Sequence, residues 1–302
     1  VRRLKAAGAV AAVQTTSSEF GGTNQTTTKI HGATRNPWNP DRTPGGSSGG
    51  SAAGVAGGIF TLATASDGGG SIRIPAGFCG LFGLKSTYGR IPRGPGIILG
   101  NATSVEGSVS RSVRDSARFL DVTNGFDLDD PKSLPRVEGY EKNLETHIDE
   151  IRTLRVAVVP GLGCATIGPE SEELIRAAAE ELITVTGMRR VDINLRLPNI
   201  MGAWGLTGTV GTRQSLGDLW PDCGADITGA MRVGIERAEA NFDLNTMVKA
   251  ETRRVELNTA MAAMFADADI VLAATNPATA FNAEGHLPST FEGVEARSSN
   301  NG

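Results

Sequence analysis

The chain has 302 residues, of which 39% are hydrophobic and 21% are charged, and its formal net charge at pH 7 is -4. A chain of this length buries a core without disulfides or metal, and its composition excludes a disordered protein. The slightly acidic balance argues against nucleic acid as a direct partner.

The three cysteines, Cys79, Cys164 and Cys223, are odd in number and scattered, with no CxxC pair. This pattern is typical of thiols in a reducing compartment and predicts no zinc site. No run approaches the ~18 apolar residues of a membrane span, and the first 13 residues lack the apolar stretch of a signal peptide. We therefore expect a cytoplasmic protein without a membrane partner.

The first half of the chain predicts short elements separated by polar loops. It opens within an apparent helix that stops at Gly8, so the chain looks truncated at its N-terminus. Ser112 and Asp115 form an S-x-x-D capping box, which predicts a helix ending near Gly125. The other predicted elements are a strand at 9–13, a proline-containing loop at 21–46, a small-residue helix at 51–58 and a buried strand at 59–65.

The second half alternates strands with helices after a charged connection at 126–152. Strands are predicted at 154–161, 189–195 and 269–275, and helices at 169–187 and 242–266. This alternation predicts an α/β fold with a mixed, mainly parallel twisted sheet that helices cover on both faces. After Pro277 the pattern ends without a closing element, so we expect one domain over 1–302 that lacks both ends.

Glycine is enriched, with 39 of the 302 residues, about twice its usual share. One cluster is GGSSGGS at 45–51, whose composition fits a flexible linker. It also satisfies G-x-S-x-G at both Ser47 and Ser48, the nucleophile elbow of hydrolases. The elbow needs a preceding strand, and residues 39–44 contain two prolines, which argues against it.

The second cluster is DGGGSIRIPA at 67–76, which follows the strand predicted at 59–65. Three glycines before Ser71 let successive backbone N–H groups point at one position, as an oxyanion hole requires. Ser71 is therefore a candidate nucleophile, and the alternative is a glycine turn with a structural serine.

A nucleophilic serine requires a base, and the chain offers no obvious one. The three histidines, His31, His147 and His286, all lie outside the glycine-rich region. The remaining chemistry is a lysine held neutral by burial, with a second hydroxyl as proton relay.

These residues carry a resemblance. GGSSGGSAAGVAGG at 45–58 and SDGGGSIRIPAGFCGLFGLKSTYGRIP at 66–92 resemble the signature of the amidase signature family, the Ser-cis-Ser-Lys amide hydrolases. TRNPW at 34–38 and the segment 107–125 are also similar to family patterns. The resemblance implies a catalytic Gly/Ser-rich core over 45–92 within the single domain.

The resemblance implies a role for each site residue. Ser71 falls on the nucleophile, and Ser47 falls on the relay serine after a cis Gly46–Ser47 bond. The backbone N–H groups of Gly68, Gly69, Gly70 and Ser71 would form the oxyanion hole. Asp67, Arg73 and Ser48 would support the turn, with Asp67 and Arg73 expected to pair.

The chain departs from the family at the general base. The lysine of the family lies upstream of anything that corresponds to Val1, and Lys5, Lys29 and Lys85 do not match it. We therefore assign the base to no residue. Smaller departures are Gln14 and Ser86, where lysine and proline are common in the family.

The resemblance implies an amidase that hydrolyses a non-peptide carboxamide to a carboxylate and an amine or ammonia, through an acyl-serine. It implies no metal and no organic cofactor, a small-molecule amide as partner, and a homodimer. Two alternatives remain: a non-catalytic fragment without the base, and the amidase subunit of a tRNA-dependent amidotransferase with protein partners. Those subunits usually carry Gln after the SIR triplet, where this chain has Ile74.

Overall fold

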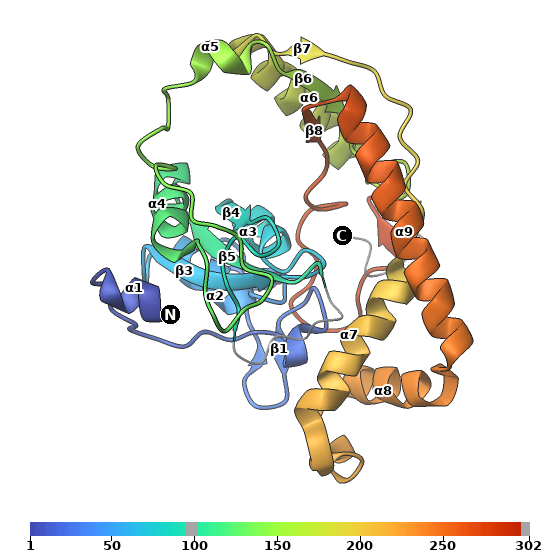
Figure 1. Cartoon of the computed structure of the whole chain (residues 1–302). Coiled ribbons are helices and arrows are strands. Elements are labelled where there is room, and N and C mark those ends of the chain that lie inside the picture. Colours follow the sequence, from blue (N-terminus) through green and yellow to red (C-terminus); the bar gives the residue numbers. More distant parts are fainter. Residues whose placement is uncertain (95–101, 297–302) are drawn as a thin grey trace. The chain divides into compact units, whose positions relative to one another are not determined.

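The structure is a computed structural model that describes residues 1–94 and 102–296. These residues form two compact units: Val1–Leu144 with Ala280–Leu287, and Glu145–Thr279 with the described residues from Pro288 onward. Figure 1 shows helices packed with strands in each unit. The α/β class is therefore confirmed, whereas the single domain over 1–302 stays a prediction.

The first unit is built on the three-stranded sheet β3-β5-β4. Both outer strands run antiparallel to β5, with Asp67 opposite Val105 and Lys85 opposite Gly107. The chain crosses from β3 through α3 to β4, and β5 then fits between them. The elements of this unit are α1 (Arg2–Ala6), β1 (Thr27–Thr28), β2 (Gly32–Ala33), α2 (Gly49–Ala56), β3 (Leu62–Asp67), α3 (Arg73–Phe78), β4 (Phe82–Lys85), β5 (Val105–Ser110) and α4 (Val113–Thr123), with a 3-10 turn at Glu19–Gly21.

The core of this unit lies between the sheet and the helices α2 and α3. A Cβ on Gly54 of α2 would overlap the Phe60 ring, so the small residues of this helix permit close packing. Burial of apolar side chains, at about 25 cal/mol per Å², stabilises this layer. Its buried members are Ala52, Ala65, Ile72, Ala76, Cys79 and Val109.

Residues 280–287 return from the second half of the sequence to complete the first unit. The Thr43 N–H donates to the Phe281 carbonyl, and the Ala283 N–H donates to the Asp41 carbonyl, both at 2.9 Å. The Phe281 ring meets the Phe78 ring edge-on at 5.9 Å. The loop before Ser47 is therefore supported by a segment more than 200 residues away in sequence.

The second unit contains the parallel sheet β7-β6-β8, in which Val156 lies opposite Arg190 and Ile270. Helix α6 ends at Gly187, which has φ of +70°. The elements are α5 (Ile148–Ile151), β6 (Arg155–Val158), α6 (Pro169–Thr186), β7 (Arg189–Arg190), α7 (Met201–Leu216), α8 (Gly229–Asn241), α9 (Leu244–Asp267), β8 (Ile270–Leu272), β9 (Thr290–Phe291) and β10 (Val294–Glu295), with 3-10 turns at Gly217–Leu219 and Asp222–Ala225.

Three details differ from the sequence predictions. The single mixed, mainly parallel sheet that the sequence predicts is found as two separate three-stranded sheets, antiparallel in the first unit and parallel in the second. The strand predicted at 9–13 is wrong, since this segment pairs with no described strand and exposes Val10 and Val13. The strand predicted at 189–195 is confined to β7.

Candidate active site

The turn after β3 carries the predicted nucleophile. β3 ends at Asp67 and α3 begins at Arg73, so Ser71 lies between a strand end and a helix start. The Asp67 carboxylate accepts hydrogen bonds from the backbone N–H groups of Gly70 at 2.8 Å and Ile72 at 3.2 Å. Gly70 has φ of +124°, a conformation that glycine adopts without a Cβ penalty. One carboxylate therefore shapes the turn, which leaves Ser71 half-buried.

Asp67 and Arg73 form the ion pair that the sequence predicts. The Arg73 Nε and Nη2 groups donate to the two carboxylate oxygens, each at 2.9 Å. Asp67 is fully buried, whereas the Arg73 side chain is 46% exposed. Burial alone would raise the pKa of Asp67, but the hydrogen bond and charge of Arg73 outweigh it, with help from the Gly70 N–H, and the pKa is lowered. The carboxylate is therefore ionised at neutral pH.

The Gly70 N–H is already engaged with Asp67, so in this structure it holds the turn. The sequence predicts an oxyanion role for the backbone N–H groups of Gly68, Gly69, Gly70 and Ser71. That role stays a prediction for all four residues.

The loop that holds Ser47 is packed against a polar segment that precedes it. The Gly46–Ser47 peptide bond is cis, as the resemblance implies. The Thr26 hydroxyl donates toward the carbonyls of Gly45 at 2.9 Å and Ser47 at 3.2 Å. A Cβ on Gly46 would lie 2.7 to 2.9 Å from backbone atoms of residues 23–25. Position 46 therefore requires glycine.

The two serine loops meet through Ser48. Its backbone N–H donates to the Ser71 carbonyl at 3.2 Å, and its hydroxyl donates to the Ser66 carbonyl at 3.4 Å. Residues 43–49 are all buried, so the flexible-linker interpretation is wrong. Residues 43–48 contain no strand, so the elbow motif lacks the strand that should lead directly into it.

The direct relay contact remains a prediction. Ser47 is 4% exposed, yet within the described part of the chain no hydrogen bond joins its hydroxyl to that of Ser71. Catalytic hydrogen bonds are often long in ligand-free enzymes and tighten when substrate binds. The structure brings the two loops together without testing the proton path.

Lys85 is the lysine whose charge reaches this site. Its ammonium group donates to the Thr103 carbonyl at 2.8 Å. Burial lowers the pKa of Lys85, the Asp67 carboxylate opposes that shift, and Arg73 adds to it. Lys5 and Lys29 are exposed. The hydrogen bond from Lys85 to Thr103 was not predicted from the sequence. The two residues come close only because of the register in which β4 pairs with β5, and the sequence does not reveal that register.

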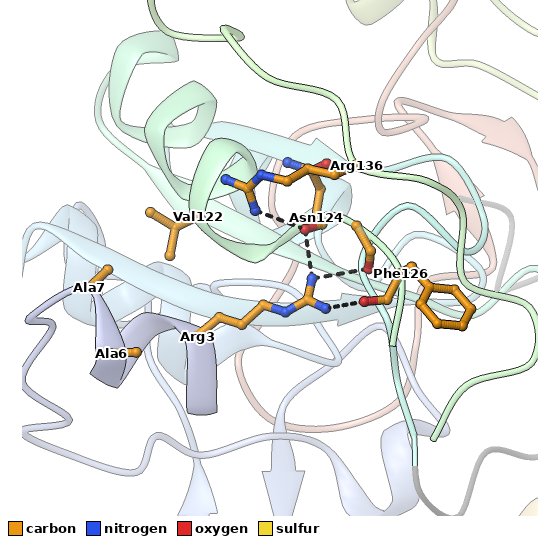
Figure 2. Close-up of a pocket in the computed structure, with 8 residues that line it drawn as sticks. Arg3, Ala6, Ala7, Val122, Asn124, Phe126 and Arg136 are labelled. Atoms are coloured by element: carbon orange, nitrogen blue, oxygen red, sulfur yellow. Dashed lines mark hydrogen bonds between the residues drawn. The ribbon is translucent and has the colours of Figure 1, made fainter. Parts of the chain in front are cut away.

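An open pocket of about 640 Å³ lies elsewhere in the first unit, where α1 meets the end of α4 (Figure 2). The Arg3 guanidinium donates to the carbonyls of residues 123–126 at 2.6 to 3.0 Å. Arg136 donates to the Asp121 carbonyl at 2.7 Å. Both cations therefore complement the negative end of the α4 dipole. None of the predicted site residues lines this pocket.

Other kinds of site find no support in residues 1–94 and 102–296. No three His, Cys, Asp or Glu side chains are grouped there to hold a metal ion. The three cysteines form no disulfide. None of the helices described there is long and apolar enough to cross a membrane.

Comparison with known proteins decides the family. The sequence model of the Amidase family matches residues 1–291, nearly the whole chain. The chain belongs to the amidase family. It is 45% identical to a glutamyl-tRNA(Gln) amidotransferase subunit from Synechococcus sp. (strain RCC307), over 64% of this chain and 39% of that protein. The same subunit from Pseudomonas fluorescens (strain SBW25) is 34% identical over 92% of this chain and 62% of that protein.

Solved structures agree with this amidase-family assignment. A bacterial aryl acylamidase of the amidase signature family superimposes with a TM-score of 0.82 at 29% identity, over 98% of this chain and 66% of that one. The 6-aminohexanoate cyclic dimer hydrolase gives a TM-score of 0.82 at 28% identity, over 100% of this chain and 64% of that one. The chain spans between about two fifths and two thirds of the length of these relatives.

Proposed function

We propose that this chain of the amidase family hydrolyses amides through an acyl-enzyme intermediate, with Ser71 as the nucleophile. The observation that carries the proposal is the nucleophile turn itself, since Asp67 binds the Gly70 and Ile72 amides while the Ser48 amide binds the Ser71 carbonyl. Rigid support of this kind is what a nucleophile needs if it is to meet a substrate carbon in one geometry.

In the proposed reaction the Ser71 Oγ attacks the amide carbon and the carbonyl oxygen becomes an oxyanion. The N–H groups of Gly68, Gly69, Gly70 and Ser71 would stabilise that charge. Ser47 would pass the Ser71 proton onward to the nitrogen, so that the C–N bond breaks and an amine or ammonia leaves. Water then attacks the acyl-Ser71 ester and releases the carboxylate. The lysine base that the resemblance implies is assigned to no residue of this chain.

A serine-directed fluorophosphonate tests this proposal. We expect the probe to modify Ser71, with peptide mapping by mass spectrometry locating the label and Ser71→Ala abolishing it. Ser66→Ala serves as the control, because Ser66 is exposed on β3 and its side chain has no assigned role. A label on Ser48 with Ser71 unmodified would overturn the assignment of the nucleophile.

A second candidate function is the amidase subunit of a tRNA-dependent amidotransferase. It is favoured by the 45% identity to such a subunit. Against it stands Ile74, where those subunits usually carry Gln. Ile74 is buried, and Cβ atoms on Gly45 and Gly70 would lie 3.1 Å and 2.5 Å from its side chain, so an apolar group packs beneath both loops. Release of ammonia from free glutamine, with no release of aniline from an anilide, would favour this candidate.

The proposal also covers the substrate class, the cellular location and the oligomeric state. We expect a small-molecule amide as substrate, a cytoplasmic location and a homodimer. The cytoplasm is supported by three cysteines that form no disulfide. Sedimentation equilibrium of the purified chain at micromolar concentration tests the dimer, and a single species of monomer mass contradicts it.

A further inference from the structure

We propose that Lys85 is a positioning residue for the nucleophile turn, because it holds the segment Thr103–Ser104 against Gly68. The inference rests on the proposed function, since it assigns Lys85 to the support of the same Ser71. It adds a residue that the relay and the oxyanion hole do not include.

The first step is the place of Lys85 in the sheet. It is the last residue of β4 and lies opposite Gly107 of β5. β5 begins at Val105, which lies opposite Asp67, the residue that opens the nucleophile turn. The Lys85 ammonium group reaches across to the Thr103 carbonyl at 2.8 Å. Lys85 therefore ties the chain just before β5 to the edge of the sheet where the turn starts.

The second step is the contact between that tied segment and the glycines. A Cβ on Gly68 would lie 2.7 Å from the Ser104 Oγ, so Ser104 packs directly on the first glycine of the turn. Arg93 gives a second support, since its Nη1 donates to the Ser104 carbonyl at 3.1 Å. Any shift of this segment changes the space beside Gly68, where an oxyanion donor is proposed.

The third step is electrostatic. Asp67 is fully buried and interacts with two cations, Arg73 by direct contact and Lys85 by charge alone. A positive charge near a buried carboxylate favours its ionised form. Lys85 therefore helps to keep Asp67 charged, and the charged carboxylate is the form that binds the Gly70 N–H strongly.

The same contacts argue that Lys85 does not act as the general base. A base needs a neutral amine whose lone pair faces the hydroxyl. The Lys85 Nζ donates to the Thr103 carbonyl at 2.8 Å, and among the described residues no hydrogen bond joins it to Ser47 or Ser71. Support of the turn fits this geometry.

The test compares three lysine substitutions in the full 302-residue chain. Lys85→Met removes the charge and the donor while it keeps the length of the side chain, and Lys85→Arg restores both. Lys142→Met is the matched control, because Lys142 is an exposed lysine of the same unit. The readouts are the saturating rate and the half-saturating concentration of fluorophosphonate labelling at Ser71, and hydrogen exchange of the amides of residues 68–71.

We expect Lys85→Met to lower the saturating rate of labelling by about tenfold, as loss of a charged hydrogen bond predicts. The half-saturating concentration should change little, exchange at residues 68–71 should accelerate, and Lys85→Arg should recover most of the rate. If Lys85→Met and the control Lys142→Met give the same labelling kinetics and the same hydrogen exchange, the inference is overturned. A different result would separate the two proposals. If the wild-type chain is not labelled at Ser71 but Lys85→Met still accelerates hydrogen exchange at residues 68–71, the proposed function is contradicted and the inference about Lys85 stands.

Gly68→Ala provides a second route to the same geometry, should Lys85→Met fail to fold. Its added methyl displaces Ser104 while Lys85 stays intact. We expect the same loss of labelling rate as with Lys85→Met. A Gly68→Ala chain that is labelled at the wild-type rate shows that Ser104 need not lie against Gly68, and the inference fails.

Discussion

Asp67 shows how much of the site depends on one side chain. It accepts hydrogen bonds from three backbone amides, those of Gly70, Ile72 and Arg73, and from the Nε and Nη2 groups of the Arg73 side chain. We expect Asp67→Asn to lower the free energy of unfolding by about 1–3 kcal/mol, because the amide cannot accept all of these bonds. Urea denaturation followed by circular dichroism measures this, with the exposed Asp41→Asn as control. Equal midpoints for the two variants contradict the prediction.

The lowered pKa of Asp67 also predicts how stability changes with pH. Its folded pKa lies below the unfolded value of about 3.9. The stabilisation is therefore complete above that unfolded value and is lost as pH falls through the folded pKa. Denaturation curves from pH 7 to pH 3 should show a steeper loss for the wild type than for Asp67→Asn. Parallel pH profiles would show that Asp67 does not contribute.

The cysteines should differ in reactivity. Cys79 is fully buried, and burial raises its pKa to about 12, so its thiolate is scarce at neutral pH. Cys164 and Cys223 are half-buried. We expect iodoacetamide at pH 8 to modify Cys164 and Cys223 in the native chain and to reach Cys79 after unfolding. Mass spectrometry of the alkylated peptides measures the order, and early modification of Cys79 contradicts the prediction.

At the scale of elements, Arg3 fixes α1 to the end of α4 (Figure 2). It donates to four carbonyls, whereas the Arg2 side chain is 78% exposed and contacts the carboxylates of Asp127 and Asp129 at the surface. We expect Arg3→Ala to cost about 1–3 kcal/mol and Arg2→Ala less than about 0.5 kcal/mol. Urea midpoints of both variants test the difference. Similar midpoints would mean that the docking of α1 adds nothing to stability.

Elements with local signals could be predicted from the sequence. The Ser112 hydroxyl accepts from the Asp115 N–H at 3.1 Å, so the capping box begins α4 as expected. Gly187 ends α6 in the left-handed conformation. Helix α7 was missed, because Gly202, Gly205 and the other glycines of its sequence disfavour a helix. This helix packs on α8 and α9, and that packing stabilises it. Contacts between distant helices leave no signal in the local sequence pattern.

The site residues also fall into two groups: those that the sequence indicated and those whose contacts it did not. The glycine cluster indicated Ser71 as a candidate nucleophile, and the resemblance to the family implied the role of Ser47 and the pairing of Asp67 with Arg73, because these residues lie within two short segments. The hydrogen bonds of Thr26 and Lys85 were not predicted. Their partners lie about 20 residues away in sequence, at distances that depend on strand register and loop path. The strand expected at 9–13 failed for a related reason, since a strand needs a partner that periodicity cannot reveal.

At the scale of the whole molecule, the two units should differ in local stability. Helix α9 has 24 residues, of which only Ala250 and Met264 are buried, whereas five of the six residues of β5 are buried. Regions with few buried contacts open more readily. We expect amides of α9 to exchange with solvent faster than those of β5, as measured by hydrogen exchange and mass spectrometry. Equal protection of both elements would point to one cooperative unit.

The return of residues 280–287 to the first unit has a consequence for biosynthesis. Thr43 and Asp41, just before the Ser47 loop, bind Phe281 and Ala283. On a ribosome that adds about 5–20 residues per second, those partners arrive on the order of ten seconds after residue 144. During that interval the first unit has its sheet, but the chain just before the Ser47 loop lacks its contacts with Phe281 and Ala283. The loop can thus gain its final support only after the whole second sheet has been synthesised, so nascent chains should acquire reactivity at Ser71 late.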